Sequence, residues 1–144
     1  MTANRPIELT SDTATKPGAA MRRAMAEAEV GDEQRGEDPT TNRLQEMVAA
    51  LLGKEAAVFL PSGAMCNQIA ICVHCRPGDE VAAADGSHIF TSEAGGAAVL
   101  AGAQTWPIPS TRGIFSAADL RRNLRQPSRH TPRTALVVLE QTNN

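Results

Sequence analysis

Aromatic residues and long apolar runs are both scarce in this chain. Only 3% of the 144 residues are aromatic, with one Trp and no Tyr, so a core has to be built from Ala, Leu, Val, Ile and Met. No apolar stretch approaches the roughly 20 residues that a membrane-spanning helix requires. The N-terminus shows no apolar segment of the kind found in secretory signal peptides. We therefore expect a cytoplasmic protein that does not associate with a membrane.

An excess of charge of one sign is also missing. The formal net charge is −2, which argues against the extended positive surface that nucleic-acid binding requires. The most basic stretch is expected to be a solvated helix face and loop, and it holds Arg121, Arg122, Arg125, Arg129 and Arg133.

Cysteine is present in a small, odd number. Three cysteines fit a reducing compartment in which thiols stay free. Cys72 and Cys75 have the spacing of a redox pair or half a zinc site, but no second ligand pair accompanies them. The spacing favours structural thiols on one helix face over either of those sites.

What the sequence does contain is an alternation of helical and strand-like segments. Helices are expected after Pro17, from Pro39 to the C-terminal Gly53, after the turn at 61–64, and over 117–125. Strands are expected over 55–60, 80–84, 104–108 and 134–140. This alternation predicts an α/β fold with a mostly parallel sheet and flanking helices.

The turn Ser62-Gly63-Ala64 lies between an expected strand and an expected helix. A helix N-terminus offers unpaired amides and the positive end of the helix dipole, so a phosphate group would fit there. An ordinary strand–helix turn with Ser62 as its N-cap explains the same residues. Neither the P-loop pattern nor the dinucleotide-binding glycine pattern is present, so both interpretations remain open.

Two histidines flank the expected strands in different ways. His88 follows the strand at 80–84, which places it at the same sheet edge as the 61–65 turn. A lone histidine is more often structural than functional, so position alone does not assign a role. His130 precedes the last strand and is expected at the opposite edge, where the pattern gives it no role.

Six segments, taken in order, resemble the N-terminal part of the low-specificity threonine aldolases. They are SDTATKP at 11–17, VGDEQRGEDPTTN at 30–42, GKEAAVFLPSGAMCN at 53–67, RPGDEV at 76–81, HIFTSEAGGAAVL at 88–100 and RTALVVLEQT at 133–142. The resemblance implies a fold-type-I enzyme that uses pyridoxal 5'-phosphate. It further implies cleavage of a β-hydroxy-α-amino acid such as threonine to glycine and an aldehyde, by a homo-oligomer, which is a tetramer in that family.

The same resemblance implies roles for individual residues. Ser62, Gly63 and Ala64 would hold the cofactor phosphate, and His88 would stack on the cofactor ring as a cofactor-binding and catalytic residue. Ser11 would bind the substrate carboxylate, and His130 would lie near the substrate hydroxyl as a substrate-binding and catalytic residue. Ala64 departs from the family pattern, which usually has Thr at this position.

The resemblance extends over only part of a family member's length. We expect residues 1–144 to form the N-terminal portion of the cofactor-binding large domain, with 1–16 as an N-terminal arm. The lysine that forms the Schiff base, the aspartate that pairs with the pyridine nitrogen and the small C-terminal domain are expected to lie outside it. The alternative is an inactive remnant or a complementing fragment that binds phosphate weakly or serves only in assembly.

Overall fold

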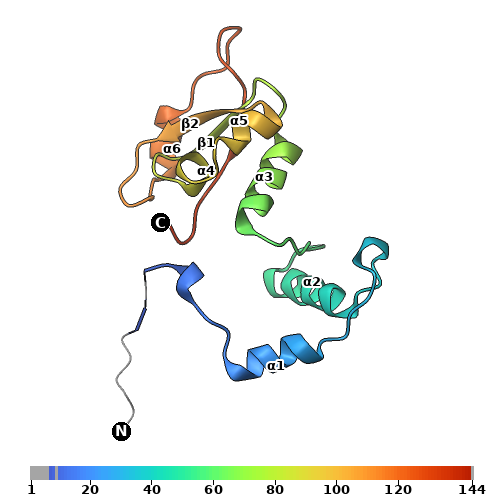
Figure 1. The fold of residues 1–144 in the computed structure, drawn as a ribbon. Coiled ribbons are helices and arrows are strands. Elements are labelled where there is room, and N and C mark those ends of the chain that lie inside the picture. The colour runs from blue at the N-terminus through green and yellow to red at the C-terminus, as the bar shows by residue number, and fades with distance from the viewer. Residues whose placement is uncertain (1–6, 9, 144) are drawn as a thin grey trace. The chain divides into compact units, whose positions relative to one another are not determined.

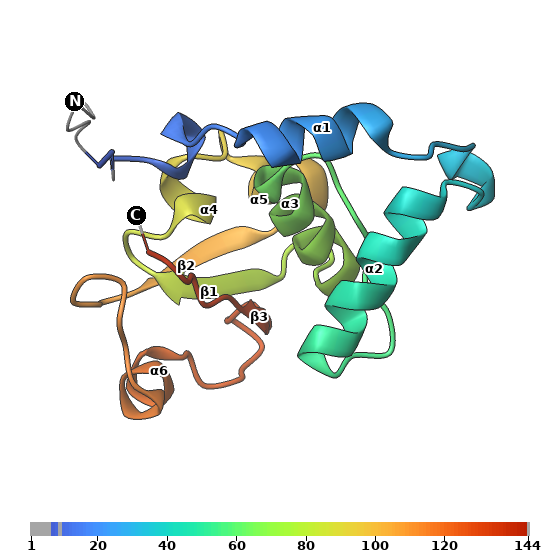
Figure 2. The ribbon, with the colours of Figure 1, turned by 90° about the horizontal axis from the view of Figure 1, so that it is seen from below.

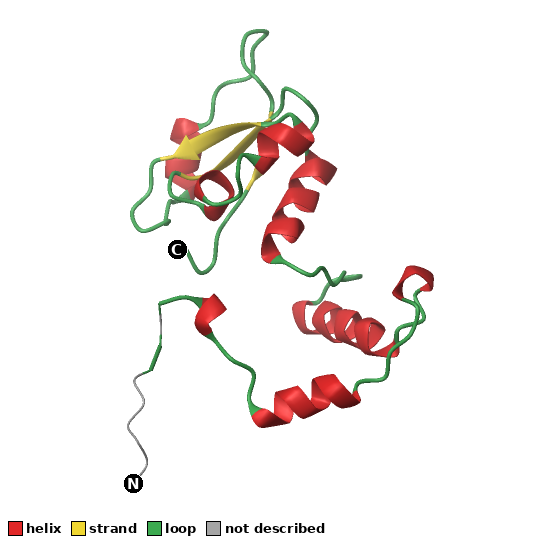
Figure 3. Ribbon diagram, in the orientation of Figure 1, coloured by secondary structure: helices red, strands yellow, loops and turns green. Residues whose placement is uncertain are grey.

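The computed structural model describes residues 7, 8 and 10–143, and it divides the chain into two compact units (Figures 1 and 3). The first unit is Met1–Phe59 and the second is Leu60–Asn144. The described part of the first unit is helical, with the 3-10 turns Asp12–Ala14 and Glu33–Arg35 and the helices α1 (Ala19–Glu27) and α2 (Pro39–Leu52). None of the helices in the described residues is long and apolar enough to cross a membrane.

Helix α2 begins and ends where its sequence predicts. The Asp38 carboxylate accepts a hydrogen bond from the Thr41 amide at 2.7 Å, and Pro39 occupies the first turn, where no N–H is needed. The amides of Thr41 and Gly31 hold the pKa of Asp38 below its ordinary value. Gly53 ends the helix in the left-handed conformation, at φ 60°.

The apolar residues of the first unit are largely uncovered. Only Ala49 is buried on α2. The exposed apolar side chains on the two helices are Met21, Met25, Leu44, Met47, Leu51 and Leu52. The apolar spacing therefore predicts the helices correctly, whereas the core that it also predicts is not formed by these side chains.

The strand expected over residues 55–60 is wrong. These residues form no strand, and Val58 and Phe59 are 69% and 53% exposed. A strand needs a neighbour to take its backbone hydrogen bonds, but the Phe59 amide donates instead to Oε1 of Gln45 at 2.9 Å. An apolar run has the composition of a buried strand whether or not a partner is present, so composition cannot detect this difference.

The second unit contains a three-stranded parallel sheet, as the α/β prediction requires. Its strands are β1 (Glu80–Ala84), β2 (Gln104–Ile108) and β3 (Thr134–Val137), in the spatial order β2-β1-β3. Its helices are α3 (Gly63–His74), α4 (His88–Thr91), α5 (Gly96–Ala101) and α6 (Ala117–Asn123). Figure 2 shows α3 and α5 on one side of the sheet and α6 on the other. Strand β3 is shorter than the predicted 134–140, although the Val138 amide still bonds to the Ala82 carbonyl at 2.8 Å.

The core of the second unit is built from small residues, as the scarcity of aromatics predicts. On one face of β1, Val81 and Ala83 pack with Ile71 of α3 and Ala97 of α5. Alanine side chains let helices approach the sheet closely. Cys75 joins this cluster, and its burial, together with the nearby charge of Asp79, raises the pKa of its thiol.

A buried acid pairs with an arginine at the amino-terminal edge of the sheet. Glu80 is fully buried and pairs with Arg125, and it also accepts a hydrogen bond from Thr134 Oγ1 at 2.8 Å. The Arg125 guanidinium lies 4.1 Å from the ring centroid of Trp106. Pairing and stacking together offset the cost of burying the Glu80 charge.

Candidate functional site

The carboxyl ends of the three strands gather polar side chains at one edge of the sheet. Asp85 follows β1 and accepts a hydrogen bond from Ser110 Oγ, beyond β2, at 2.6 Å. That hydroxyl holds the pKa of Asp85 below its ordinary value. Glu140 lies beyond β3 and accepts the His88 amide at 2.5 Å. In open α/β sheets this edge is where ligands bind, so it is the place to look for a site.

His88 begins α4 at this edge and is partly exposed. Its side chain is 36% accessible, and its Nδ1 lies 2.8 Å from Oε1 of Glu93. Its backbone amide is taken by Glu140, so both the ring and the main chain are held by carboxylates. The Nδ1 side of the imidazole is therefore fixed by Glu93, while its Nε2 side is open to a ligand.

Glu93 is the buried centre of a hydrogen-bonded cluster. Its side chain is 1% accessible, and Oε1 also accepts Asn67 Nδ2 at 2.7 Å, while Oε2 accepts Gln68 Nε2 at 2.5 Å. Burial by itself raises the pKa of Glu93, but the hydrogen bonds from Asn67, His88 and Gln68 outweigh it and hold that pKa below its ordinary value. The carboxylate is therefore charged at neutral pH, with three side chains arranged around it.

Two residues with left-handed backbone follow Glu93. Ala94 has φ 52° and Gly95 has φ 73°, so two successive residues are left-handed. A non-glycine residue in that conformation costs about 1–2 kcal/mol. At Gly96, a Cβ would lie 2.5 Å from the side-chain Cδ of Gln68. A side chain at position 96 would displace the end of the Gln68 side chain, which reaches Glu93 in this arrangement.

The N-terminus of α3 has the form expected of an anion site. Ser62 is the N-cap, and its hydroxyl accepts the Met65 amide at 3.2 Å. Helix geometry gives the amides of Gly63 and Ala64 no acceptor within the helix. A Cβ built at Gly63 would have nothing within 4 Å, and all three turn residues are exposed. Two amides and the positive end of a twelve-residue helix therefore face open space.

Glu93 links this helix terminus to His88. Asn67 lies four residues after Gly63, which is about 6 Å along the axis, and residues at that spacing share a helix face. The carboxylate that receives Asn67 also receives the His88 ring. The structure therefore links His88 to α3, the helix that begins at the predicted Ser62-Gly63-Ala64 turn, through Glu93 and Asn67.

The other two predicted site residues have their own local contacts. Ser11 belongs to the first unit, where its hydroxyl accepts the Thr13 amide at 3.3 Å and caps a 3-10 turn. His130 is exposed in the loop before β3, at the amino-terminal edge of the sheet and so opposite His88. Its Nε2 lies 3.0 Å from Arg129 Nε. The roles predicted for Ser11 and His130 stay predictions.

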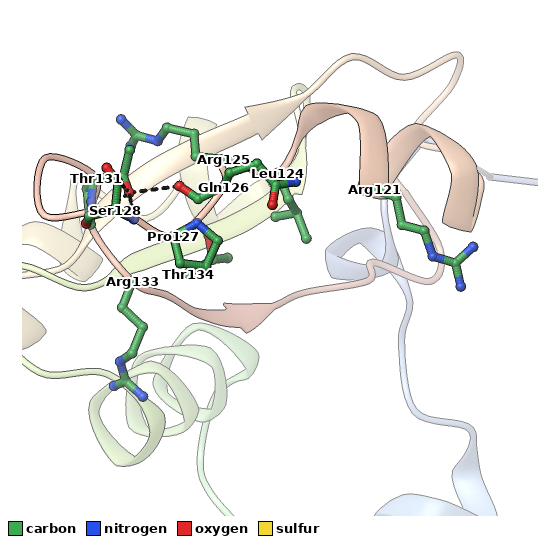
Figure 4. Close-up of a pocket in the computed structure, with 10 residues that line it drawn as sticks. Arg121, Leu124, Arg125, Gln126, Pro127, Ser128, Thr131, Arg133 and Thr134 are labelled. Carbon is green, nitrogen blue, oxygen red and sulfur yellow. Dashed lines mark hydrogen bonds between the residues drawn. The ribbon is translucent and has the colours of Figure 1, made fainter.

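The loop that carries His130 borders a separate cavity (Figure 4). The cavity has a volume of about 610 Å³, and its lining includes Arg121, Arg125, Arg133 and Thr134. Arg133 is occupied by a two-pronged bond to Asp79, at 3.0 and 2.5 Å, which holds the pKa of Asp79 below its ordinary value. This cavity lies at the amino-terminal edge, away from the edge that carries His88.

Sequence reasoning did not single out Asn67, Gln68, Glu93 or Glu140 as site residues. One signal for Glu93 was present, because it is the only charged residue between Asp85 and Arg112. A lone acid in a segment of small and apolar residues has to find polar partners if that segment is buried. The two amides carried no such signal, since they are ordinary residues on a helix.

The sheet, the open helix terminus and the histidine at one edge are typical of an α/β enzyme domain, and comparison with known proteins specifies the class. The beta-eliminating lyase family matches residues 8–144, and the chain belongs to that family.

Its relatives include low-specificity threonine aldolases. The chain is 43% identical over 139 residues to the low specificity L-threonine aldolase of Escherichia coli (strain K12), covering 96% of this chain and 42% of that protein. It is 43% identical to a probable low-specificity L-threonine aldolase 2 of Arabidopsis thaliana, covering 98% of this chain and 41% of the relative. The Saccharomyces cerevisiae low specificity L-threonine aldolase is 38% identical. The chain thus spans about two fifths of the length of these relatives.

Proposed function

We propose that this chain is part of a carbon–carbon lyase of the threonine aldolase type, which uses pyridoxal 5'-phosphate to cleave a β-hydroxy-α-amino acid such as threonine to glycine and an aldehyde. The observation that carries the proposal is the open N-terminus of α3, a helix that is joined through Asn67 and Glu93 to the partly exposed imidazole of His88. Its threonine aldolase relatives support it independently.

The residues present fit the phosphate end of that cofactor. The Ser62 hydroxyl accepts the Met65 amide and keeps its own O–H to donate, so it and the amides of Gly63 and Ala64 can bind phosphate oxygens. The absent side chain of Gly63 lets a phosphate approach these amides closely. His88, at the same edge, would lie against the cofactor ring and orient it.

When bound, the cofactor supplies the electron sink for cleavage of the Cα–Cβ bond. This chain's own residues would bind and orient it, and the imidazole of His88 would accept the proton of the substrate hydroxyl. The chain has two lysines, Lys16 and Lys54, and both lie in the first unit. We therefore expect the lysine that carries the cofactor to lie outside residues 60–144.

The placement of His130 bears on assembly. His130 lies in the loop at the amino-terminal edge of the sheet and His88 at the carboxyl edge, so we expect the predicted role of His130 near the substrate hydroxyl to be played in the site of a second copy. The exposed apolar side chains of α1 and α2 offer surface for self-association. A homo-oligomer is thus part of the proposal, and sedimentation of the purified chain tests it.

The phosphate site is tested by adding the hydroxyl that the family usually has at position 64. Ala64→Thr offers one more hydrogen bond to a charged group, worth about 1.5–3 kcal/mol, so pyridoxal 5'-phosphate should bind about 10- to 100-fold more tightly. Ala64→Val has nearly the same shape without the hydroxyl and is the matched control. Binding is followed by absorbance, with pyridoxal as the ligand that lacks phosphate.

Two results would count against the proposal. Equal affinity of the Ala64→Thr and Ala64→Val variants for pyridoxal 5'-phosphate would show that the phosphate does not bind at this turn. Equal binding of pyridoxal and pyridoxal 5'-phosphate would show the same. Because residues 60–144 contain no lysine, an inactive remnant or complementing fragment is the second candidate. Threonine-dependent aldehyde release by the purified chain would exclude that candidate.

A further inference from the structure

We propose that Glu93 is a positioning residue that holds His88 in the tautomer with the proton on Nδ1, so that Nε2 presents a lone pair at the carboxyl edge of the sheet. The relevance of this lone pair to catalysis rests on the proposed function. The tautomer itself follows from the contacts of residues in the second unit.

The direction of the His88–Glu93 bond sets the tautomer. An ionised carboxylate only accepts hydrogen bonds, so the nitrogen 2.8 Å from Oε1 has to carry a proton. The pKa of Glu93 lies below its ordinary value, so the carboxylate is ionised at neutral pH. A neutral imidazole with its proton on Nδ1 has none on Nε2, which makes Nε2 the atom able to accept a proton from a ligand.

The orientation of the carboxylate is itself determined by its other partners. Asn67 and Gln68 donate from α3 to Oε1 and Oε2, so both oxygens are engaged and the side chain cannot rotate freely. The left-handed residues Ala94 and Gly95 direct the chain immediately after it. The imidazole therefore meets an acceptor that is fixed in both position and orientation.

A purely structural role for Glu93 accounts for less of this geometry. A carboxylate that served only to join α3 to the α4–α5 loop would need the two amides and no imidazole. Here the third donor is the side chain that stands at the open edge, and its main chain is separately held by Glu140. One carboxylate holds the ring of His88 and another holds its main chain, which indicates that the placement of this partly exposed residue matters.

Nuclear magnetic resonance of the chain, with ¹⁵N-labelled histidine and no cofactor, tests the proposal. Long-range proton–nitrogen correlations distinguish the two tautomers, and a His88→Asn sample assigns the signals among the three histidines. In the unsubstituted chain at alkaline pH, neutral His88 is expected in the Nδ1–H form. A spectrum showing His88 mainly in the Nε2–H form would overturn the proposal.

The Glu93→Gln variant tests whether the Glu93 carboxylate is what favours the Nδ1–H tautomer of His88. Glutamine has one carbonyl oxygen for three donors and brings donors of its own, so the Nδ1–H to Nε2–H ratio of His88 should fall by about tenfold or more. Glu93→Asp retains an acceptor-only group and should keep the Nδ1–H form. Glu27→Gln, a change of the exposed acid at the end of α1, is the matched control and should leave the spectrum unchanged.

An unchanged ratio in a folded Glu93→Gln variant would refute the proposal. If that variant fails to fold, the unsubstituted and Glu93→Asp spectra still decide it. Failure of the chain to bind pyridoxal 5'-phosphate would count against the proposed function alone, because none of these spectra depends on the cofactor.

Discussion

The cluster around Glu93 makes a sharp prediction at Gly96. In Gly96→Ala the new methyl group would lie 2.5 Å from Cδ and Oε1 of Gln68, so that side chain has to rotate away. Rotation breaks the 2.5 Å bond from Gln68 to the buried Glu93 carboxylate. A hydrogen bond to a charged group is worth about 1.5–3 kcal/mol, and the helix preference of alanine returns at most about 1 kcal/mol. The free energy of unfolding should therefore fall by about 0.5–2 kcal/mol.

Urea unfolding followed by tryptophan fluorescence measures this change. The chain has one tryptophan, Trp106, which lies on β2 in the same unit. Gly63→Ala is the matched control, because Gly63 is likewise the first residue of its helix and a Cβ there meets nothing within 4 Å. The control should be neutral or slightly stabilising.

A double-mutant cycle with Gln68→Ala isolates the collision. With the glutamine side chain removed, Gly96→Ala should lose its cost, and the two changes should be strongly non-additive. The reasoning is refuted if Gly96→Ala destabilises the Gln68→Ala background as much as it destabilises the unsubstituted chain. A loss in the Gly63→Ala control as large as that in Gly96→Ala would also contradict it.

Three further predictions concern a cap, a pH dependence and a buried ion pair. Ser62→Ala removes the N-cap of α3 and should lower the free energy of unfolding by about 1 kcal/mol, measured in urea; no change would mean that the cap bond contributes nothing. The pKa of Glu93 is lower in the folded chain than its ordinary value, so its stabilisation is present above about pH 4.5 and is lost as the pH falls through the folded value. The difference in unfolding free energy between the unsubstituted chain and Glu93→Gln should thus shrink in acid. A difference that grows in acid would contradict a lowered pKa of Glu93 in the folded chain. Arg125→Met leaves Glu80 buried without its cation and should lower the free energy of unfolding by about 3–5 kcal/mol, measured in heat or urea. Arg121→Met, at an exposed position, is the control and should cost little. Equal losses in the two variants would show that the Arg125–Glu80 pair is not the cause of the loss.

Features that depend on neighbouring residues were predictable from the sequence. The bounds of α2 follow from Asp38, Pro39 and Gly53, because capping acts within one turn of the helix. Strands β1 and β2 occupy the predicted residues 80–84 and 104–108. The placement of His88 at the carboxyl edge of the sheet follows from its position just after the strand at 80–84. The same expectation for the turn at 62–64 rested on a strand over 55–60 that the described structure does not form.

The partners of these residues depended on the tertiary structure. Whether residues 55–60 form a strand depends on a neighbouring strand that composition cannot reveal, and the described structure forms no strand there. Asn67 and Glu93 are 26 residues apart, and His88 and Glu140 are 52 apart, yet each pair is hydrogen bonded. Capping and periodicity reach only a few residues along the chain, whereas a buried carboxylate bonds to whatever donors the packing of distant elements brings to it. The alternation of strands and helices located the edge of the sheet, and only packing decided which side chains would hold His88 there.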